Sequence, residues 1–226
     1  TYFLLLIYSH MPAISVDLGE TLVGFRPRSY EYMLGILKDY GYKIDERTFF
    51  RSLVRVLSKS NFANEEGLNP LSLNDLFYEL GIHPCRKIME EIATRDKYQD
   101  YFLYEDAIDF LKEVKKKYKV VIVSNSTRRI HKIVKEFNLD KYVDKVIASC
   151  DVGVVKPNPK IFSYAKKYVG EIILHVGDIY ELDVVGARRA FIDSILLDRF
   201  DFYPEVKVKA KTLYDVLRYM EVKGLI

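Results

Sequence analysis

The second half of the chain alternates helical patterns with short apolar runs, and this alternation constrains the fold more than any other feature. After Glu105 the helical stretch DAIDFLKEVKKKY leads into the apolar run KVVIVS. Three more such pairs follow, and their apolar runs are DKVIAS, EIILHVGD and DSILLD. Strands that are apolar throughout are typical of parallel sheets with both faces covered by helices. We therefore predict an α/β fold built on a parallel sheet flanked by helices.

A first strand, Ala13–Asp17, precedes this alternation and is separated from it by a long helical stretch. Between Tyr30 and about Thr94 the apolar residues recur at helical spacing, with breaks at glycine- and proline-containing turns. We predict a helical insertion between the first two strands of the sheet. In open parallel sheets ligands bind at the carboxyl ends of the strands, so this insertion is well placed to cover a site.

Composition restricts the classes of partner and the cellular compartment. A net charge of +3 over 226 residues gives no reason to expect nucleic acid or a membrane as the main partner. Cys85 and Cys150 are isolated and match no metal or redox spacing, so we expect free thiols in the cytoplasm. Residues 1–10 are apolar but lack a charged leader, and we expect an N-terminal extension or a short edge strand. No pattern indicates a particular oligomeric state.

Polar residues follow four of the predicted strands. Asp17 ends the first strand, Ser124 ends VVIVS, Lys156 follows the strand at 146–148, and Asp178 ends IILHVGD with Asp183 five residues later. A parallel sheet would bring these residues to one edge. Two carboxylates at contact distance repel each other unless a divalent cation neutralises them, and oxygen ligands suit Mg²⁺. A lysine and a hydroxyl could then hold a phosphoryl group while Asp17 attacks it.

Four short motifs in order along the chain resemble those of the haloacid dehalogenase-like (HAD) superfamily. They are VDLGETL, VIVSNST, VVKPNPKIF and HVGDIYELD. The resemblance runs from about Met11 to the C-terminus and includes the helical insertion. It implies a Rossmann-like core formed by residues 11–22 and 102–226, with a small all-helical cap formed by residues 23–101. It also implies a hydrolase, most simply a Mg²⁺-dependent phosphatase acting on a small phosphorylated metabolite through an aspartyl-phosphate.

The same resemblance implies the ligands of the cation. Asp17 would be both the nucleophile and a Mg²⁺ ligand, and the backbone carbonyl of Gly19 would be a second ligand. Asp178 would be the acidic ligand of the fourth motif. Asp183 would be a metal ligand or a carboxylate just behind the ligands, although a helix N-terminal charge is an alternative interpretation.

Other residues of the motifs are expected to contact the phosphoryl group. Ser124 would bind it, with Asn125 beside Ser124 as a further substrate-binding residue. Lys156 would link the nucleophile to the phosphoryl oxygens. Thr21 would support the loop that carries Asp17. A plain helix cap is the alternative interpretation of Ser124.

Two positions depart from the family pattern. Phosphatases of the family usually carry an aspartate where this chain has Gly19, and that aspartate is the general acid and base. Leu182 also replaces an asparagine that is frequent in the fourth motif. A missing general acid lowers a rate by roughly 10²–10⁴-fold, and Glu20, a cap residue or water could replace it. A metal-independent 2-haloacid dehalogenase and a catalytically impaired binding protein therefore stay as alternatives.

The remaining candidates have structural interpretations. We expect His175, inside a strand, to be a packed core histidine. We expect Arg26 and Arg28 either to meet an anionic substrate or to lie in an exposed hinge. Four aromatic residues at helical spacing in the insertion are expected to form its core: Phe49, Phe50, Phe77 and Tyr78.

Overall fold

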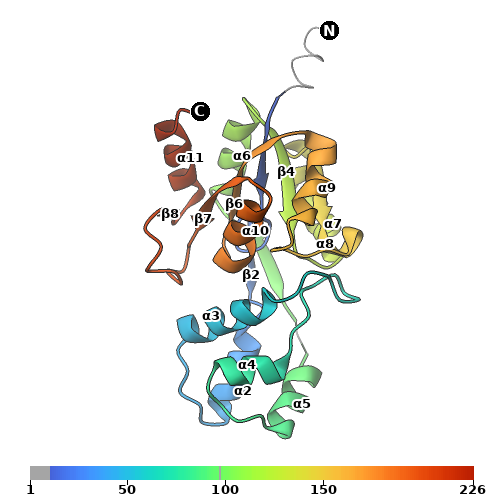
Figure 1. The fold of residues 1–226 in the computed structure, drawn as a ribbon, viewed down its shortest axis with the longest axis vertical. Coiled ribbons are helices and arrows are strands. Elements are labelled where there is room, and N and C mark those ends of the chain that lie inside the picture. The colour runs from blue at the N-terminus through green and yellow to red at the C-terminus, as the bar shows by residue number, and fades with distance from the viewer. Residues whose placement is uncertain (1–10, 97) are drawn as a thin grey trace.

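The computed structural model describes residues 11–96 and 98–226, so the expected N-terminal extension lies outside the described residues. Its centre is a six-stranded parallel sheet in the order β5-β4-β1-β6-β7-β8 (Figure 1). The strands are β1 (Ala13–Val16), β4 (Lys119–Ser124), β5 (Lys145–Ala148), β6 (Ile172–Gly177), β7 (Asp193–Leu197) and β8 (Lys209–Ala210). The parallel sheet expected from the sequence is confirmed, and the first strand lies at its centre.

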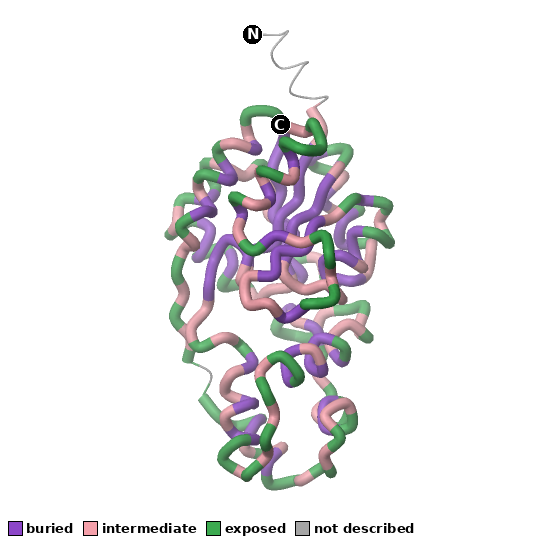
Figure 2. The backbone as a smooth tube through the Cα atoms, turned by 90° about the vertical axis from the view of Figure 1, so that its left-hand side faces the viewer, coloured by how far each residue is buried: buried purple, intermediate pink, exposed green. Residues whose placement is uncertain are grey.

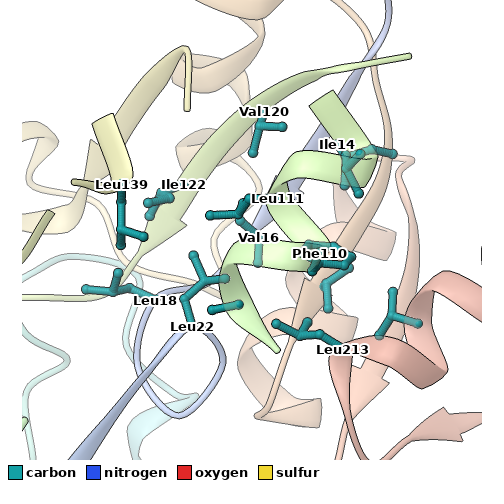
Figure 3. Packing of buried hydrophobic residues seen from close by; sticks show 14 of the residues in the cluster. Ile14, Val16, Leu18, Leu22, Phe110, Leu111, Val120, Ile122, Leu139 and Leu213 are labelled. Carbon is teal, nitrogen blue, oxygen red and sulfur yellow. The ribbon is translucent and has the colours of Figure 1, made fainter. Parts of the chain in front are cut away.

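Helices cover both faces of this sheet. One face packs on α6 (Ala107–Lys115), α7 (Arg129–Glu136) and α11 (Leu213–Val222). The other face packs on α9 (Lys160–Val169) and α10 (Val185–Arg189). Figure 3 shows Val16 and Ile122 of the sheet beside Phe110 and Leu111 of α6. All six residues of β4 are buried, because both of its faces are covered, and this explains the apolar run at 120–123.

Short helical elements follow two strands at the carboxyl edge of the sheet. These are the helix α8 (Ser149–Val152) and the π-helical turn η2 (Tyr180–Val184). The 3₁₀ turn η1 (Leu139–Lys141) instead leads into the start of β5. Helix α8 follows β5 directly, and η2 follows β6 after two residues. The segments that carry the third and fourth motifs therefore belong to this edge.

The insertion forms a separate group of helices at the lower end of the molecule in Figure 1. Its helices are α2 (Glu31–Asp39), α3 (Glu46–Leu57), α4 (Leu73–Glu79) and α5 (Arg86–Thr94). Phe49, Phe50 and Phe77 are buried in its core, as expected. The expectation for Tyr78 is wrong, since 86% of this residue is exposed. It follows Phe77 on a short helix, and a step of one residue turns its side chain toward solvent.

An antiparallel strand pair, which the sequence did not predict, joins the insertion to the sheet. It consists of β2 (Val23–Arg26) and β3 (Asp100–Leu103). The ring of Phe102 covers Gly24, where a Cβ atom would lie 2.3 Å from the ring. The chain therefore enters and leaves the insertion along one two-stranded ribbon.

The insertion also contacts the sheet domain at two places beyond this ribbon. On one side Phe50 of α3 stacks on Phe202, with ring centroids 4.4 Å apart. On the other side the loop after α3 reaches back, and the backbone amide of Ala63 donates to the carbonyl of Gly153 at 3.0 Å. Figure 2 shows buried backbone running through the sheet and, separately, in the insertion. Among the described residues, no helix combines the length and hydropathy that crossing a bilayer requires.

Candidate active site

The carboxyl ends of the central strands bring four of the predicted residues together. Asp17 follows β1, Ser124 is the last residue of β4, and Asp178 follows β6. Lys156 comes from the loop after α8 and is buried, with 1% of its surface exposed. The backbone amide of Asp17 donates to the carbonyl of Val176 at 2.8 Å, which fixes the start of its loop against β6.

The ammonium group of Lys156 lies between two carboxylates. Its Nζ donates to Oδ1 of Asp183 at 2.5 Å and lies 3.1 Å from Oδ1 of Asp17. Burial alone would lower the pKa of Lys156, but Asp17 and Asp183 outweigh it and raise the pKa above its ordinary value. Lys156 is therefore a fixed positive charge beside the predicted nucleophile.

Asp183 is held by more partners than the sequence indicated. Nε2 of His175 lies 2.8 Å from Oδ1 of Asp183, and the backbone amide of Ile179 donates to Oδ2 at 3.0 Å. Burial would raise the pKa of Asp183, but Lys156 and the hydrogen bond of His175 lower it. Both oxygens of Asp183 are thus occupied, so in this structure its carboxylate anchors Lys156.

His175 is fully buried, and both of its ring nitrogens have polar partners. Burial lowers the pKa of His175, so the ring is neutral and donates from Nε2 to Asp183. The other nitrogen, Nδ1, then accepts from the hydroxyl of Ser15 at 2.8 Å. At Gly177 a Cβ atom would lie 2.2 Å from Cγ of Asp183, so the close approach of Asp183 to β6 requires glycine. The sequence showed that His175 is buried, but gave no signal for its link to Asp183.

Asp17, Asp178 and Asp183 form a carboxylate cluster that suits a divalent cation. Each offers an oxygen atom, and these atoms lie within 4.8 Å of one another. Burial raises the pKa of Asp17 and, further, that of Asp178, and the neighbouring carboxylates add to both shifts. Oδ1 of Asp17 is buried, and Nζ of Lys156 is paired with it at 3.1 Å. A cation bound by Asp17 and Asp178 would neutralise the repulsion between these two carboxylates. Gly19 lies on the same loop as Asp17.

The second-motif residues have different surroundings. Ser124 is buried, and its hydroxyl hydrogen bond lowers the pKa of Asp17 against the effect of burial. Asn125 instead holds the loop of Lys156: its Oδ1 accepts from the Lys156 amide at 2.8 Å, and its Nδ2 donates to the Lys156 carbonyl at 3.0 Å. Asn125 also donates to Oδ1 of Asn69 at 2.7 Å. In this structure Asn125 therefore positions the lysine loop.

Asn69 is a residue of the insertion that sequence reasoning missed. It is buried, and its Nδ2 donates to the carbonyl of Lys156 at 3.0 Å and to that of Leu57 at 3.1 Å. Asn69 thus connects the end of α3 in the insertion with the backbone of Lys156. Nothing in the local sequence GLNP distinguishes it from an ordinary turn asparagine.

The loop after Asp17 shows why Glu20 is a poor substitute for the missing acid. Its carboxylate accepts from the amide of Phe25 at 2.9 Å, from Arg26 at 3.0 Å and from the hydroxyl of Tyr104 at 2.6 Å. Burial and the hydrogen bond to Glu20 raise the pKa of Tyr104 to about 12. Both oxygens of Glu20 therefore serve as acceptors in a closed network. Arg26, expected either at a substrate or in a hinge, belongs to this network.

Thr21 and Arg28 are also placed by the structure. Thr21 is buried, and its carbonyl accepts from Arg199 at 2.8 Å, so it anchors the loop through its backbone. Arg28 is paired with Glu31 at 2.8 Å and stacks over the ring of Phe200, 4.3 Å from its centroid. Arg28 therefore joins the insertion to the sheet domain.

Comparison with known proteins agrees with this geometry. The family model of the haloacid dehalogenase-like hydrolases matches residues 11–190. An uncharacterized protein of Saccharomyces cerevisiae is 28% identical over 220 residues, which cover 84% of this chain and 72% of that protein. A glyceraldehyde 3-phosphate phosphatase of Methanopyrus kandleri is 27% identical over 166 residues, covering 69% and 68%.

A solved structure shares the fold. The HAD phosphatase from Thermococcus onnurineus superposes with a TM-score of 0.57 at 21% identity, covering 93% of this chain and 98% of that one. This match extends over nearly the whole chain and shows the same fold. On the strength of the family match over residues 11–190, the chain belongs to the haloacid dehalogenase-like hydrolases.

Proposed function

We propose that this hydrolase is a Mg²⁺-dependent phosphatase acting on a small phosphorylated metabolite, with Asp17 as the nucleophile. The observation that carries the proposal is the position of Lys156, whose Nζ lies 3.1 Å from Asp17 and 2.5 Å from Asp183. A buried cation beside the proposed nucleophile suits a transferring phosphoryl group, which carries negative charge on its oxygens.

The reaction would proceed in two displacements at phosphorus. An oxygen of Asp17 forms a bond to phosphorus while the bond from phosphorus to the alcohol oxygen breaks, which gives an aspartyl-phosphate. Water then attacks phosphorus, inorganic phosphate leaves, and the carboxylate of Asp17 is regenerated. Lys156 and Ser124 stabilise the phosphoryl oxygens. Mg²⁺, held by Asp17, Asp178 and the carbonyl of Gly19, would supply further neutralisation of negative charge.

The substrate would be small because the site is covered. Asp17 is 7% exposed and Lys156 is 1% exposed, and Asn69 of the insertion donates to the carbonyl of Lys156. We assign residues 23–101 to the cap, whose loop at Asn69 reaches the lysine. The archaeal relative named as a phosphatase of a three-carbon phosphate ester supports the same class of substrate.

The test compares two substrates and two variants. Purified protein is incubated with an aryl phosphate, with and without Mg²⁺, and in parallel with a chlorinated carboxylic acid. We expect phosphate release that requires Mg²⁺ and is lost in Asp17→Asn. The matched control is Asp140→Asn, because Asp140 is exposed and lies in η1, and this variant should keep the activity.

The other outcomes decide between the alternatives. Halide release without metal would refute the proposal and identify a 2-haloacid dehalogenase. No release from either substrate, from protein that binds Mg²⁺ and is folded, would favour a binding protein. Phosphate release that persists in Asp17→Asn would exclude Asp17 as the nucleophile.

A further inference from the structure

Three side chains of metal-ligating type converge at the surface where α7 and α8 meet, apart from the carboxylate cluster. His131 comes from α7, and Cys150 and Asp151 come from α8. Their nitrogen, sulfur and oxygen atoms all lie within 4.8 Å of one another. Nε2 of His131 lies 2.8 Å from Oδ2 of Asp151, and the thiol of Cys150 donates to Oδ1 of Asp151 at 3.7 Å. The sequence gave no spacing motif here, because the ligands lie on two different helices.

These separations are close to those of a tetrahedral zinc site. Zinc binds nitrogen and oxygen ligands at about 2.0–2.2 Å and sulfur at about 2.3 Å, which places neighbouring ligand atoms roughly 3.3–3.8 Å apart. The distance from Cys150 to Asp151 already fits. The side chains of His131 and Asp151 are 48% and 43% exposed, so they can separate slightly to admit an ion. Their exposure also leaves a coordination position for water.

The backbone beneath the cluster is fixed. The hydroxyl of Ser149, the residue before Cys150, is buried, accepts from the amide of Ser126 at 2.8 Å and donates to the carbonyl of Gly67. Cys150 packs against Gly67 so closely that a Cβ atom at position 67 would lie 2.4 Å from its own Cβ. The backbone of α8 at Cys150 and Asp151 is therefore held in place by these contacts. His131 lies on α7, whose opposite face is buried.

The chemistry of the three ligands selects the class of metal. A thiolate and an imidazole favour Zn²⁺ and similar transition metals, whereas Mg²⁺ and Ca²⁺ prefer oxygen ligands. A thiolate, a carboxylate and a neutral imidazole together carry two negative charges, which match a divalent ion. A metal ion binds the thiolate form of a cysteine, so binding should weaken as the pH falls.

We propose that His131, Cys150 and Asp151 bind one Zn²⁺-class ion, with water as the fourth ligand. An ordinary surface ion pair between His131 and Asp151 beside a spectator thiol is the competing account. In that case no absorption band of a bound metal ion should depend on Cys150. The site does not use the residues proposed for phosphatase activity, so its test does not depend on that activity.

Cobalt(II) reports directly on a thiolate ligand. The full chain is titrated with Co²⁺ in the presence of a phosphine reductant, and absorption is followed in the near-ultraviolet and visible range. We expect a sulfur-to-cobalt charge-transfer band that saturates at one ion per chain. Zn²⁺ should abolish the band, and excess Mg²⁺ should leave it unchanged. The band should also persist in Asp178→Asn, which alters the carboxylate cluster instead.

Matched variants separate this site from incidental binding. Cys150→Ser should lose the charge-transfer band, and Cys85→Ser, which changes the other free cysteine, should keep it. His131→Gln should weaken Co²⁺ binding by about tenfold or more. Circular dichroism checks that each variant is folded. If Cys150→Ser does not fold, His131→Gln becomes the decisive variant. A band that persists in Cys150→Ser, or that disappears in Cys85→Ser, would overturn the proposal, as would no band in the unchanged protein at a tenfold excess of Co²⁺.

Discussion

An aspartate in place of Gly19 would fit the loop after β1 without backbone strain. Gly19 does not adopt the left-handed conformation, and a Cβ atom there would lie 3.6 Å from the nearest ring carbon of Phe25, an ordinary contact. Gly177 is different, because a Cβ atom there would collide with Asp183 at 2.2 Å. Glycine is therefore required by the fold at position 177 and not at position 19. We expect Gly19→Asp to fold and to place a carboxyl group two residues after the proposed nucleophile.

The size of the expected gain follows from the role of a general acid. Such a group contributes roughly 10²–10⁴-fold in rate, which is about 2.7–5.4 kcal/mol of transition-state stabilisation. The nearby carboxylates of Asp17 and Asp178 would raise the pKa of the new aspartate and favour its protonated, proton-donating form. The gain should be largest for alkyl phosphates, whose leaving alkoxide needs a proton. It should be below about tenfold for aryl phosphates, whose phenolate leaves without one.

The assay measures kcat/KM for one alkyl and one aryl phosphate in the unchanged protein, in Gly19→Asp and in Gly19→Asn. Asparagine has the same shape as aspartate and cannot act as an acid, so Gly19→Asn is the matched control. We expect only Gly19→Asp to gain on the alkyl phosphate. Equal rates for the two variants, or an equal gain on both substrates, would refute the reasoning that position 19 lacks only a proton donor.

Three further predictions concern the stability of the site. The pKa of Asp178 is raised in the folded, metal-free protein, so the folded state loses stability as the pH rises from the ordinary carboxyl pKa through the pKa of folded Asp178. Mg²⁺ should therefore raise the melting temperature more at about pH 8 than at about pH 5. At 100 times its Kd, Mg²⁺ adds roughly 2.7 kcal/mol, or about 5–10 °C; equal shifts at both pH values would contradict this. Asn69→Ala removes hydrogen bonds to the buried backbone of Lys156 and should lower the free energy of unfolding in urea by about 1–3 kcal/mol with a fall in kcat; unchanged unfolding would count against that link. His175→Ala leaves Asp183 with one partner fewer and a cavity beside it, and should cost about 2–4 kcal/mol in the same measurement; a loss below about 0.5 kcal/mol would show that the pair is not stabilising.

The parts of the fold that were predictable are those with local signals. The buried strand β4 is apolar at nearly every position, so its sequence alone indicated a sheet covered on both faces. The ribbon of β2 and β3 was missed, because each strand has four residues and the two are separated by the whole insertion. No turn sequence joins them, so no hairpin signal exists. Tyr78 was placed wrongly because α4 has only seven residues, too few for a helical period to define one face.

The site residues also divide into those that the sequence predicts and those that only the tertiary structure brings together. Asp17, Ser124 and Asp178 end strands, and the topology of a parallel sheet was enough to bring them together. The contact of His175 with Asp183 depends on the π-helical turn η2, which places a residue eight positions later against the strand. Asn69 reaches Lys156 only through the path of a long loop. Contacts of that kind arise from tertiary structure and leave no local pattern to read.

The central position of β1 has a consequence for the order in which the molecule is assembled during synthesis. Its residues are made before those of its partners: the partner beginning at Lys119 is made about 100 residues later and the partner beginning at Ile172 about 160 residues later. At roughly 5–20 residues per second, the strand waits on the order of ten seconds or more for both neighbours. The helices of the insertion can form by local contacts in that interval, while β1 stays an unpaired apolar segment. The loop of the proposed nucleophile therefore gains its neighbour β6 only late in synthesis. A nascent chain that stops before β6 would leave one edge of β1 unpaired and prone to aggregation.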